Sequence, residues 1–145
     1  MEFGFEENEI KARFYLEKDS YLIGQTIKGS YFIEYSGIKK PKNIHLRIRS
    51  FAERLDLKKA HSQDIWYKDI QISDPAGKDC CIRDVFGIEL PSIAPFSGFW
   101  NTFRVEWVIE AEVVLYNGER KKCRAYFDVY KVYDKLFEFS EPVAL

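Results

Sequence analysis

Residues 104–133 read RVEWVIEAEVVLYNGERKKCRAYFDVYKVY, and this segment carries the clearest structural signal in the chain. Apolar and polar residues alternate from Arg104 to Tyr116 and again from Arg120 to Tyr133, on either side of a short break at 117–119. A period of two residues is typical of a β-strand that buries one face, and a glycine-containing break between two such runs predicts a β-hairpin. The apolar face of the first run consists of Val105, Trp107, Ile109, Ala111, Val113 and Leu115.

The length of the hairpin loop is predicted by matching the apolar faces of its two strands. A two-residue loop would place Val113 opposite Lys122 and would set core residues against charges. A three-residue loop at 117–119 places apolar residues opposite one another, and we predict this loop with Gly118 or a neighbour in a left-handed conformation. The predicted pairs are Val113–Cys123, Ala111–Ala125, Ile109–Phe127 and Trp107–Val129 on the apolar face, and Glu112–Arg124 on the polar face.

The same two-residue period recurs along the rest of the chain, whereas a helical period of 3.6 residues is almost absent. It predicts further strands at 10–17, 27–35, from 44 onward, at 64–72 and at 80–90. Residues 52–63 fit one or two helical turns, and a charged loop fits them as well.

Each predicted strand has one apolar face, and no predicted helix is long enough for a crossover connection. Two sheets must therefore pack face to face. The sequence therefore predicts an all-β fold, an immunoglobulin-like antiparallel β-sandwich of about seven to nine strands, with a closed barrel as the alternative. The 145 residues suffice for one domain, 1–145, with its core at 10–133 and a C-terminal tail or extra edge strand at 134–145.

Composition and charge exclude several classes of protein. The net charge is −1, from 22 Lys and Arg against 23 Asp and Glu, which argues against a protein that binds nucleic acid by neutralising phosphates. No apolar run approaches the roughly 18 residues of a transmembrane segment, and the acidic start MEFGFEENE does not resemble a signal peptide. We expect a cytoplasmic protein, with membrane association only through partners.

Two parts of the chain, taken together, resemble the arrestin family. Residues 21–31, YLIGQTIKGSY, are similar to the aromatic-x-x-Gly-x-x-hydrophobic-x-Gly pattern that opens the second main strand of arrestin domains. Residues 86–91, FGIELP, precede a connection at 95–99, PFSGF, and a strand at 105–113, VEWVIEAEV. This order resembles the arrestin run in which a strand ends in Leu-Pro and a Pro/Ser/Phe/Gly connection leads to the next strand. The resemblance spans residues 10–133.

The family, which includes retromer's arrestin-like subunit and bacterial sporulation-control proteins, has two such sandwiches in tandem, and this chain has room for one, of the N-terminal type. The resemblance implies a non-enzymatic adaptor or scaffold that binds other proteins or peptides through a sheet edge or end loops, without a cofactor. A homodimer that recreates the tandem arrangement is a further hypothesis. Apolar residues at both ends, Phe3 and Phe5 and then Leu136, Phe137 and Phe139, would add an edge strand, cover the sheet or pair with a second copy.

The densest basic region is 39–59, and within it Arg47 and Arg49 are candidate partner-binding residues. One interpretation is a patch for phosphorylated, acidic or anionic groups. The favoured alternative is a solvated face whose charge is balanced by Glu53, Asp56 and Asp64.

Aromatic residues crowd the connection after the Leu-Pro turn, and Phe96, Phe99 and Trp100 are the remaining candidate partner-binding residues. They either close the end of the sandwich or serve as exposed anchors for a partner, because aromatic side chains dominate interface hot spots. The alternative function is a binding module for carbohydrate or another small ligand, with Trp66, Tyr67 and Trp100 as a stacking platform.

Signals for metal binding or catalysis are weak. His45 and His61 are the only histidines, no Cys-x-x-Cys or His-x-x-x-His pattern is present, and both are expected on the surface. Cys80 and Cys81 point to opposite faces of a predicted strand, so one of them is expected in the core. We expect neither a metal site nor an enzyme.

Overall fold

The computed structural model describes residues 1–56, 61–73, 75, 81–91, 95, 97–100 and 102–130, without the side chains of His61 and Trp100. The described part is built from ten strands and one short 3₁₀ turn, η1, at Gly37–Lys39. The strands are β1 (Glu2–Glu7), β2 (Ile10–Leu16), β3 (Ser20–Leu22), β4 (Thr26–Tyr35), β5 (Pro41–Arg54), β6 (His61–Ser73), β7 (Cys81–Glu89), β8 (Gly98–Trp100), β9 (Phe103–Leu115) and β10 (Arg120–Tyr130).

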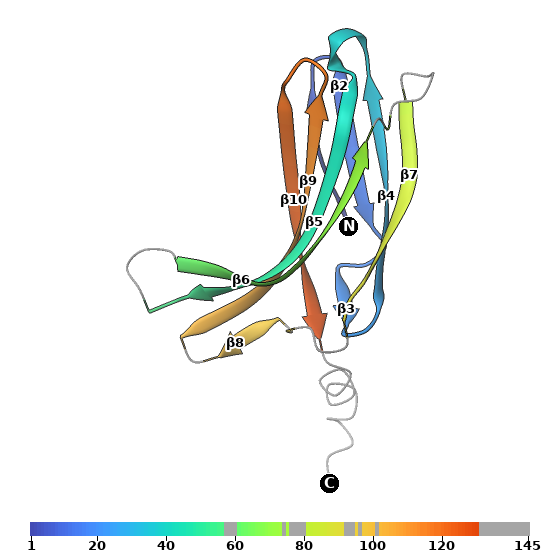
Figure 1. Cartoon of the computed structure of the whole chain (residues 1–145). Helices are drawn as coiled ribbons and strands as arrows, with labels where there is room; N and C mark the ends of the chain where they lie inside the picture. The colour runs from blue at the N-terminus through green and yellow to red at the C-terminus, as the bar shows by residue number, and fades with distance from the viewer. Residues whose placement is uncertain are drawn as a thin grey trace.

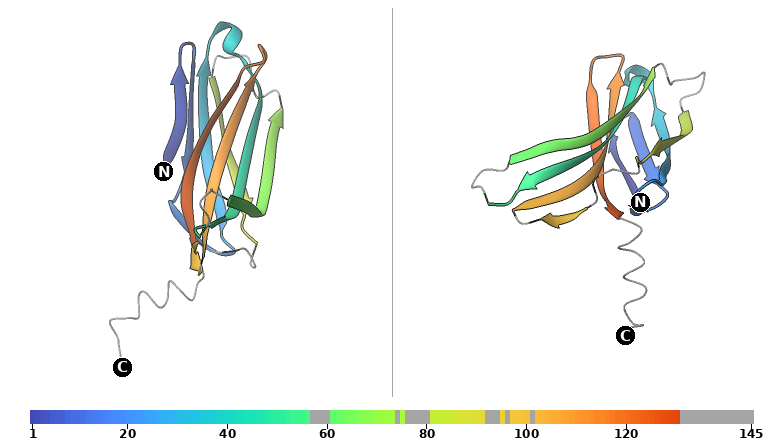
Figure 2. Two further views of the ribbon diagram at one scale, coloured as in Figure 1. Left: turned by 90° about the vertical axis from the view of Figure 1, so that its left-hand side faces the viewer. Right: turned by 60° about the horizontal axis from the view of Figure 1, so that its bottom comes forward.

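The strands form two sheets that pack face to face (Figure 1; Figure 2, left), which confirms the predicted β-sandwich rather than a closed barrel. One sheet has four strands in the order β1-β2-β4-β7. The other has six, in the order β3-β10-β9-β5-β6, with β8 paired to β9. All pairings are antiparallel except that of β3 with β10. The described strands exceed the predicted seven to nine because β3 and β8 were not predicted, and β1 was only one of the alternatives for the N-terminal residues.

The alternating pattern forms the core as predicted. On β9 the side chains from Trp107 to Leu115 at every second position are buried, and on β2 the same holds from Ile10 to Leu16. Each fully buried large apolar side chain contributes roughly 1.5–3 kcal/mol of transfer free energy. At the lower end of the core, Trp107 packs against Trp66 and Phe127, with ring centroids 5.4 and 6.0 Å apart.

The register of the last hairpin differs from the prediction by two residues. Cys123 pairs with Ala111 and Phe127 with Trp107, so apolar residues still face the core. The loop has three residues, but it is 116–118 rather than 117–119: the amide of Gly118 donates to the carbonyl of Leu115 (3.0 Å). Gly118 has φ 94°, the predicted left-handed conformation, and only this placement puts the glycine at the loop position that needs it.

Two predicted non-strand regions contain strands. Residues 52–54 continue β5 and residues 61–63 begin β6, so neither helical turns nor a loop occupy these ends of the predicted 52–63 connection. The N-terminal residues form β1, an edge strand, in which Phe3 is buried and stacks on Phe14 at 5.5 Å. Of the predictions for the two ends, the edge strand is therefore confirmed for residues 2–7, and the tail at 134–145 lies outside the described residues.

The six-stranded sheet is longer than the sheet that covers it. The end of β5, the starts of β6 and β9, and β8 curve away from the sandwich (Figure 1; Figure 2, right). The register of β5 against β6 shifts between Ser50 and Phe51, and such a bulge increases local bending and twist. We call this part the extension: residues 51–54, 61–65, 98–100 and 103–106.

Candidate functional site

A groove lies where the extension separates from the sandwich. β9 and β10 are paired as far as Trp107 and Phe127, and below this pair the two strands diverge. β8 follows the β9 side of the gap, where Gly98 pairs with Val105. We call this groove the fork.

The fork is held open by the chain that leads into β8. The amide of Ser97 donates to the carbonyl of Val129 (2.7 Å), and the amide of Val129 donates to the Ser97 hydroxyl (3.0 Å). The indole of Trp107, fully buried, donates through Nε1 to the carbonyl of Pro95 (2.8 Å). These bonds tie Pro95 to β9 and Ser97 to β10, so the groove is part of the folded structure.

The fork has a volume of about 560 Å³ and aromatic walls. Phe99 on β8, 71% exposed, and Tyr126 on β10, 51% exposed, both line the groove. Aromatic side chains exposed beside a groove mark a candidate interaction site.

Among the described residues, the charged groups that line the fork are three carboxylates, of Asp19, Glu106 and Asp128, and one guanidinium, of Arg104. Arg104 is already neutralised, because it bonds to Glu53 at 2.7 Å and lies 3.1 Å from Glu106; the hydrogen bond to Glu53 raises the pKa of Arg104. Asp19 and Asp128 form no ion pair with any residue that the structure describes. The fork therefore carries net negative charge.

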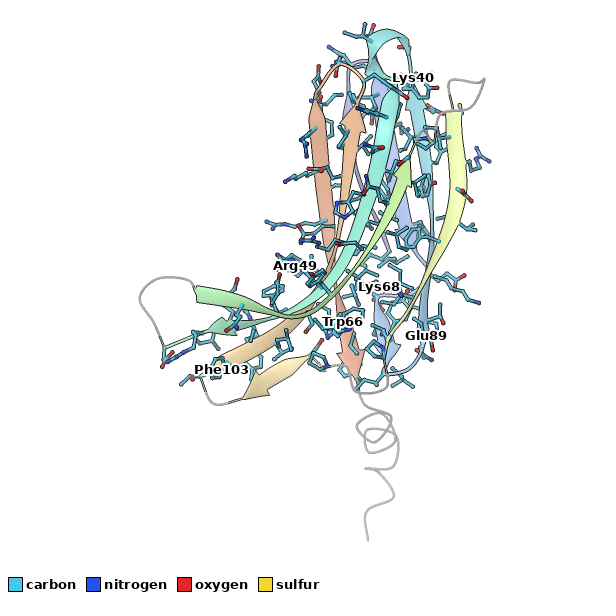
Figure 3. All side chains as sticks on the ribbon, viewed as in Figure 1. Lys40, Arg49, Trp66, Lys68, Glu89 and Phe103 are labelled. Atoms are coloured by element: carbon cyan, nitrogen blue, oxygen red, sulfur yellow. The ribbon has the colours of Figure 1, made fainter. Side chains whose placement is uncertain are left out.

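The predicted basic residues lie on the middle of the same sheet, and the structure places each beside carboxylates. Arg47 forms a two-point ion pair with Asp69 (2.6 and 3.0 Å). Arg49 bonds to Glu110 and, at 2.7 Å, to Asp64. We call these five residues the ion-pair lattice, and Arg49 lies close to the base of the extension (Figure 3). The hydrogen bond from Arg47 lowers the pKa of Asp69.

The stacking platform proposed from the sequence does not form. Trp66 points inward and packs on Trp107, whereas Tyr67, its neighbour on β6, faces outward beneath Arg47 at 5.1 Å. Consecutive residues on a strand point to opposite faces, so the two rings cannot share one surface. The side chains of Phe96 and Trp100 lie outside the described residues, and the fourth aromatic of that connection, Phe103, lies toward the outer end of the extension (Figure 3).

The fork includes residues that sequence reasoning missed, chiefly Tyr126, Asp128 and Asp19. The alternation along 120–133 predicts that Tyr126 and Asp128 face outward, and this is the signal that could have found them. Only the tertiary structure brings them beside Phe99, which was predicted.

The remaining titratable candidates do not form a reactive centre among the residues described. His45 lies 3.4 Å from Asp69 on the outer face, and Cys81 is exposed. Burial raises the pKa of the Cys123 thiol to about 12, which disfavours the nucleophilic thiolate. No group of three or more His, Cys, Asp or Glu suited to a metal ion occurs in the described part, and no helix there is long and apolar enough to cross a membrane.

No protein-family model matches the chain, and no curated protein matches it in sequence. Its structure is similar to the crystal structure of Spo0M, the sporulation control protein of Bacillus subtilis, with a TM-score of 0.59 and 17% sequence identity. The match covers 94% of this chain and 56% of the Spo0M chain. The chain therefore has an arrestin-like all-β sandwich fold, which agrees with the resemblance found in the sequence.

Proposed function

We propose that this domain is a non-enzymatic, cytoplasmic protein-binding module, and that the fork is its binding surface. The observation that carries the proposal is the pair of exposed aromatic side chains, Phe99 and Tyr126, on the walls of a preformed groove. Exposed aromatic side chains beside a structured pocket supply most of the energy in protein interfaces when a partner covers them. Spo0M is described as a control protein, and a binding role is in keeping with that description.

A groove formed by backbone pairing favours a peptide or protein loop as the partner. Pro95 and Ser97 are hydrogen-bonded to Trp107 and Val129 within the folded chain, so the shape does not depend on a ligand. A preformed surface binds with less loss of conformational entropy than a flexible loop. The small-ligand alternative loses its basis, because Trp66 and Tyr67 do not share a face.

The test is an affinity capture from lysate of the source cells, with the tagged full chain as bait and mass spectrometry as the measurement. Phe99→Ala with Tyr126→Ala is expected to reduce a specific partner at least tenfold, because each truncation removes a large contact surface. Folding of the variant is checked by its thermal transition.

The matched control is Tyr15→Ala, on the outer face of the four-stranded sheet, where Tyr15 is 50% exposed and thus comparable with Tyr126. The control bait should retain the partner. Equal loss from both baits, or full retention by the Phe99/Tyr126 variant, would contradict the assignment of the fork.

A further inference from the structure

We infer that the fork recognises a positively charged peptide segment, in which an arginine or lysine side chain enters between the aromatic walls. This inference rests on the proposed function and specifies the chemistry of the partner. It follows from the charges that the fold leaves unpaired, the arrangement of the aromatic rings and the contrast with the rest of the same sheet.

The unpaired charge of the fork is negative and lies at one place. The amide of Asp128 donates to the carbonyl of Asp19 (3.1 Å), so these two residues are neighbours across the β3–β10 pairing. Their carboxylates add to a lining with a formal charge of −2, given by three carboxylates and one guanidinium. A cationic group bound beside these carboxylates gains their Coulomb attraction.

The aromatic walls suit a cation as well as an apolar chain. A guanidinium or ammonium group over an aromatic ring gains about 0.5–2 kcal/mol, more when water is excluded. On this sheet Arg47 lies over Tyr67 and Arg54 over Phe103, at 5.1 and 5.3 Å from the ring centroids. Tyr126 has a guanidinium of this chain nearby, that of Arg124 at 5.9 Å, whereas Phe99 has none among the described residues.

An acidic or phosphorylated partner fits the fork poorly. Its charge would meet Asp19 and Asp128, and the one cation of the lining, Arg104, is already bound to Glu53. Like-charge contacts at an interface lower affinity and slow association, whereas complementary charges accelerate it. The charge of the fork therefore selects a basic segment over an acidic one.

The experiment begins with a display library of random twelve-residue peptides selected on the immobilised full chain, with Phe99→Ala/Tyr126→Ala protein for counter-selection. Selected peptides are expected to carry arginine or lysine beside an aromatic or aliphatic residue. A synthetic peptide of the most enriched sequence is then titrated by fluorescence anisotropy. Asp19→Asn with Asp128→Asn should weaken binding of this peptide about tenfold. For the wild-type chain, raising the salt concentration should also weaken binding, because both carboxylates are exposed to solvent.

The matched control is Glu34→Gln with Glu89→Gln, which changes the net charge equally at two exposed positions of the four-stranded sheet. It should leave the affinity unchanged. An equal loss in both double variants would mean general electrostatic attraction and would overturn the inference.

Other outcomes separate the inference from the proposed function. Selected peptides that need Phe99 and Tyr126 but lack positive charge would overturn the inference and leave the binding function standing. A selection without any peptide that depends on these two residues would count against both. A dimer in light scattering that becomes a monomer on Phe99→Ala would mean that a second copy occupies the fork, which also overturns the inference.

Discussion

The ion-pair lattice and the fork lie on the same sheet and are built from similar residues, yet they differ in how their side chains are paired. In the lattice, Arg47 and Arg49 each bond to carboxylates of neighbouring strands. In the fork, Asp19 and Asp128 have no such partner within the described residues, and Phe99 is 71% exposed. The difference shows that a dense run of charges does not itself mark a binding surface, because the fold can neutralise it internally.

The difference arises from strand pairing. Where β5, β6 and β9 stay in register, opposite charges face one another across the ladder, as Arg47 does with both Asp69 and Glu110. Where β9 leaves β10 below Trp107, Asp128 has no neighbour on β9 and pairs only with β3. The fork is thus a product of the curvature of the long sheet.

The largest effect is expected at Trp107, which lies beneath both regions and packs on Trp66 and Phe127. Trp107→Ala should lower the free energy of unfolding by about 3–5 kcal/mol, because it leaves a large cavity in the core. Urea denaturation followed by circular dichroism measures this. A loss below about 1 kcal/mol would show that the rings carry little of the stability.

Trp107→Phe distinguishes the contribution of the hydrogen bond at the fork from that of ring packing in the core. It keeps much of the buried ring but removes the donor to the Pro95 carbonyl, which leaves that acceptor without its indole partner. We expect the free energy of unfolding to fall by about 1–3 kcal/mol. Amide exchange should accelerate more, relative to wild type, at Ser97 and Val129 than at residues of the lattice. Uniform changes at both places would contradict a local role for this bond.

A smaller effect is expected in the lattice. Arg49→Ala removes bonds to Glu110 and Asp64, and it should lower the free energy of unfolding by about 1 kcal/mol because the pairs are partly exposed to solvent. Binding of a fork-dependent peptide should stay within twofold of wild type. A tenfold loss of that binding with intact folding would move the binding surface to the lattice.

The smallest effect is a change in pH dependence. Because Arg47 lowers the pKa of Asp69 in the folded state, the ion pair stabilises the fold above the unfolded carboxyl pKa of about 4. That stabilisation is lost as the pH falls through the lower, folded pKa. Arg47→Met should return the pKa of Asp69 toward its ordinary value, which a carbon-13 NMR titration of the carboxyl group detects; an unchanged pKa would show that Arg47 is not its cause.

The sequence predicted the fold class and the buried faces because both depend on the two-residue period alone. Matching the apolar faces of two strands cannot distinguish registers that differ by two residues, because such a shift keeps every side chain on the same face of the sheet. The hairpin register was therefore wrong by two, and only the left-handed position of Gly118 resolves it. The short strands β3 and β8 were missed because three residues give too little periodicity.

Of the residues that line the fork, only Phe99 was named as a candidate from the sequence. Phe99 stood out as one of several aromatic residues in a connection, and it is exposed; its role as a partner-binding residue stays a prediction. Tyr126 and Asp128 gave no signal beyond their outward positions, because their role depends on where β9 and β10 diverge. That divergence is a feature of the tertiary structure, which alternation along one strand does not encode.

The most direct test of the account compares the two regions in one measurement. A partner captured by the wild-type chain is purified and titrated by calorimetry against two variants of checked stability, Phe99→Ala/Tyr126→Ala and Arg47→Ala/Arg49→Ala. The account predicts at least a tenfold rise in the Kd for the fork variant and less than a twofold rise for the lattice variant. The reverse order would contradict it and would assign the binding surface to the lattice.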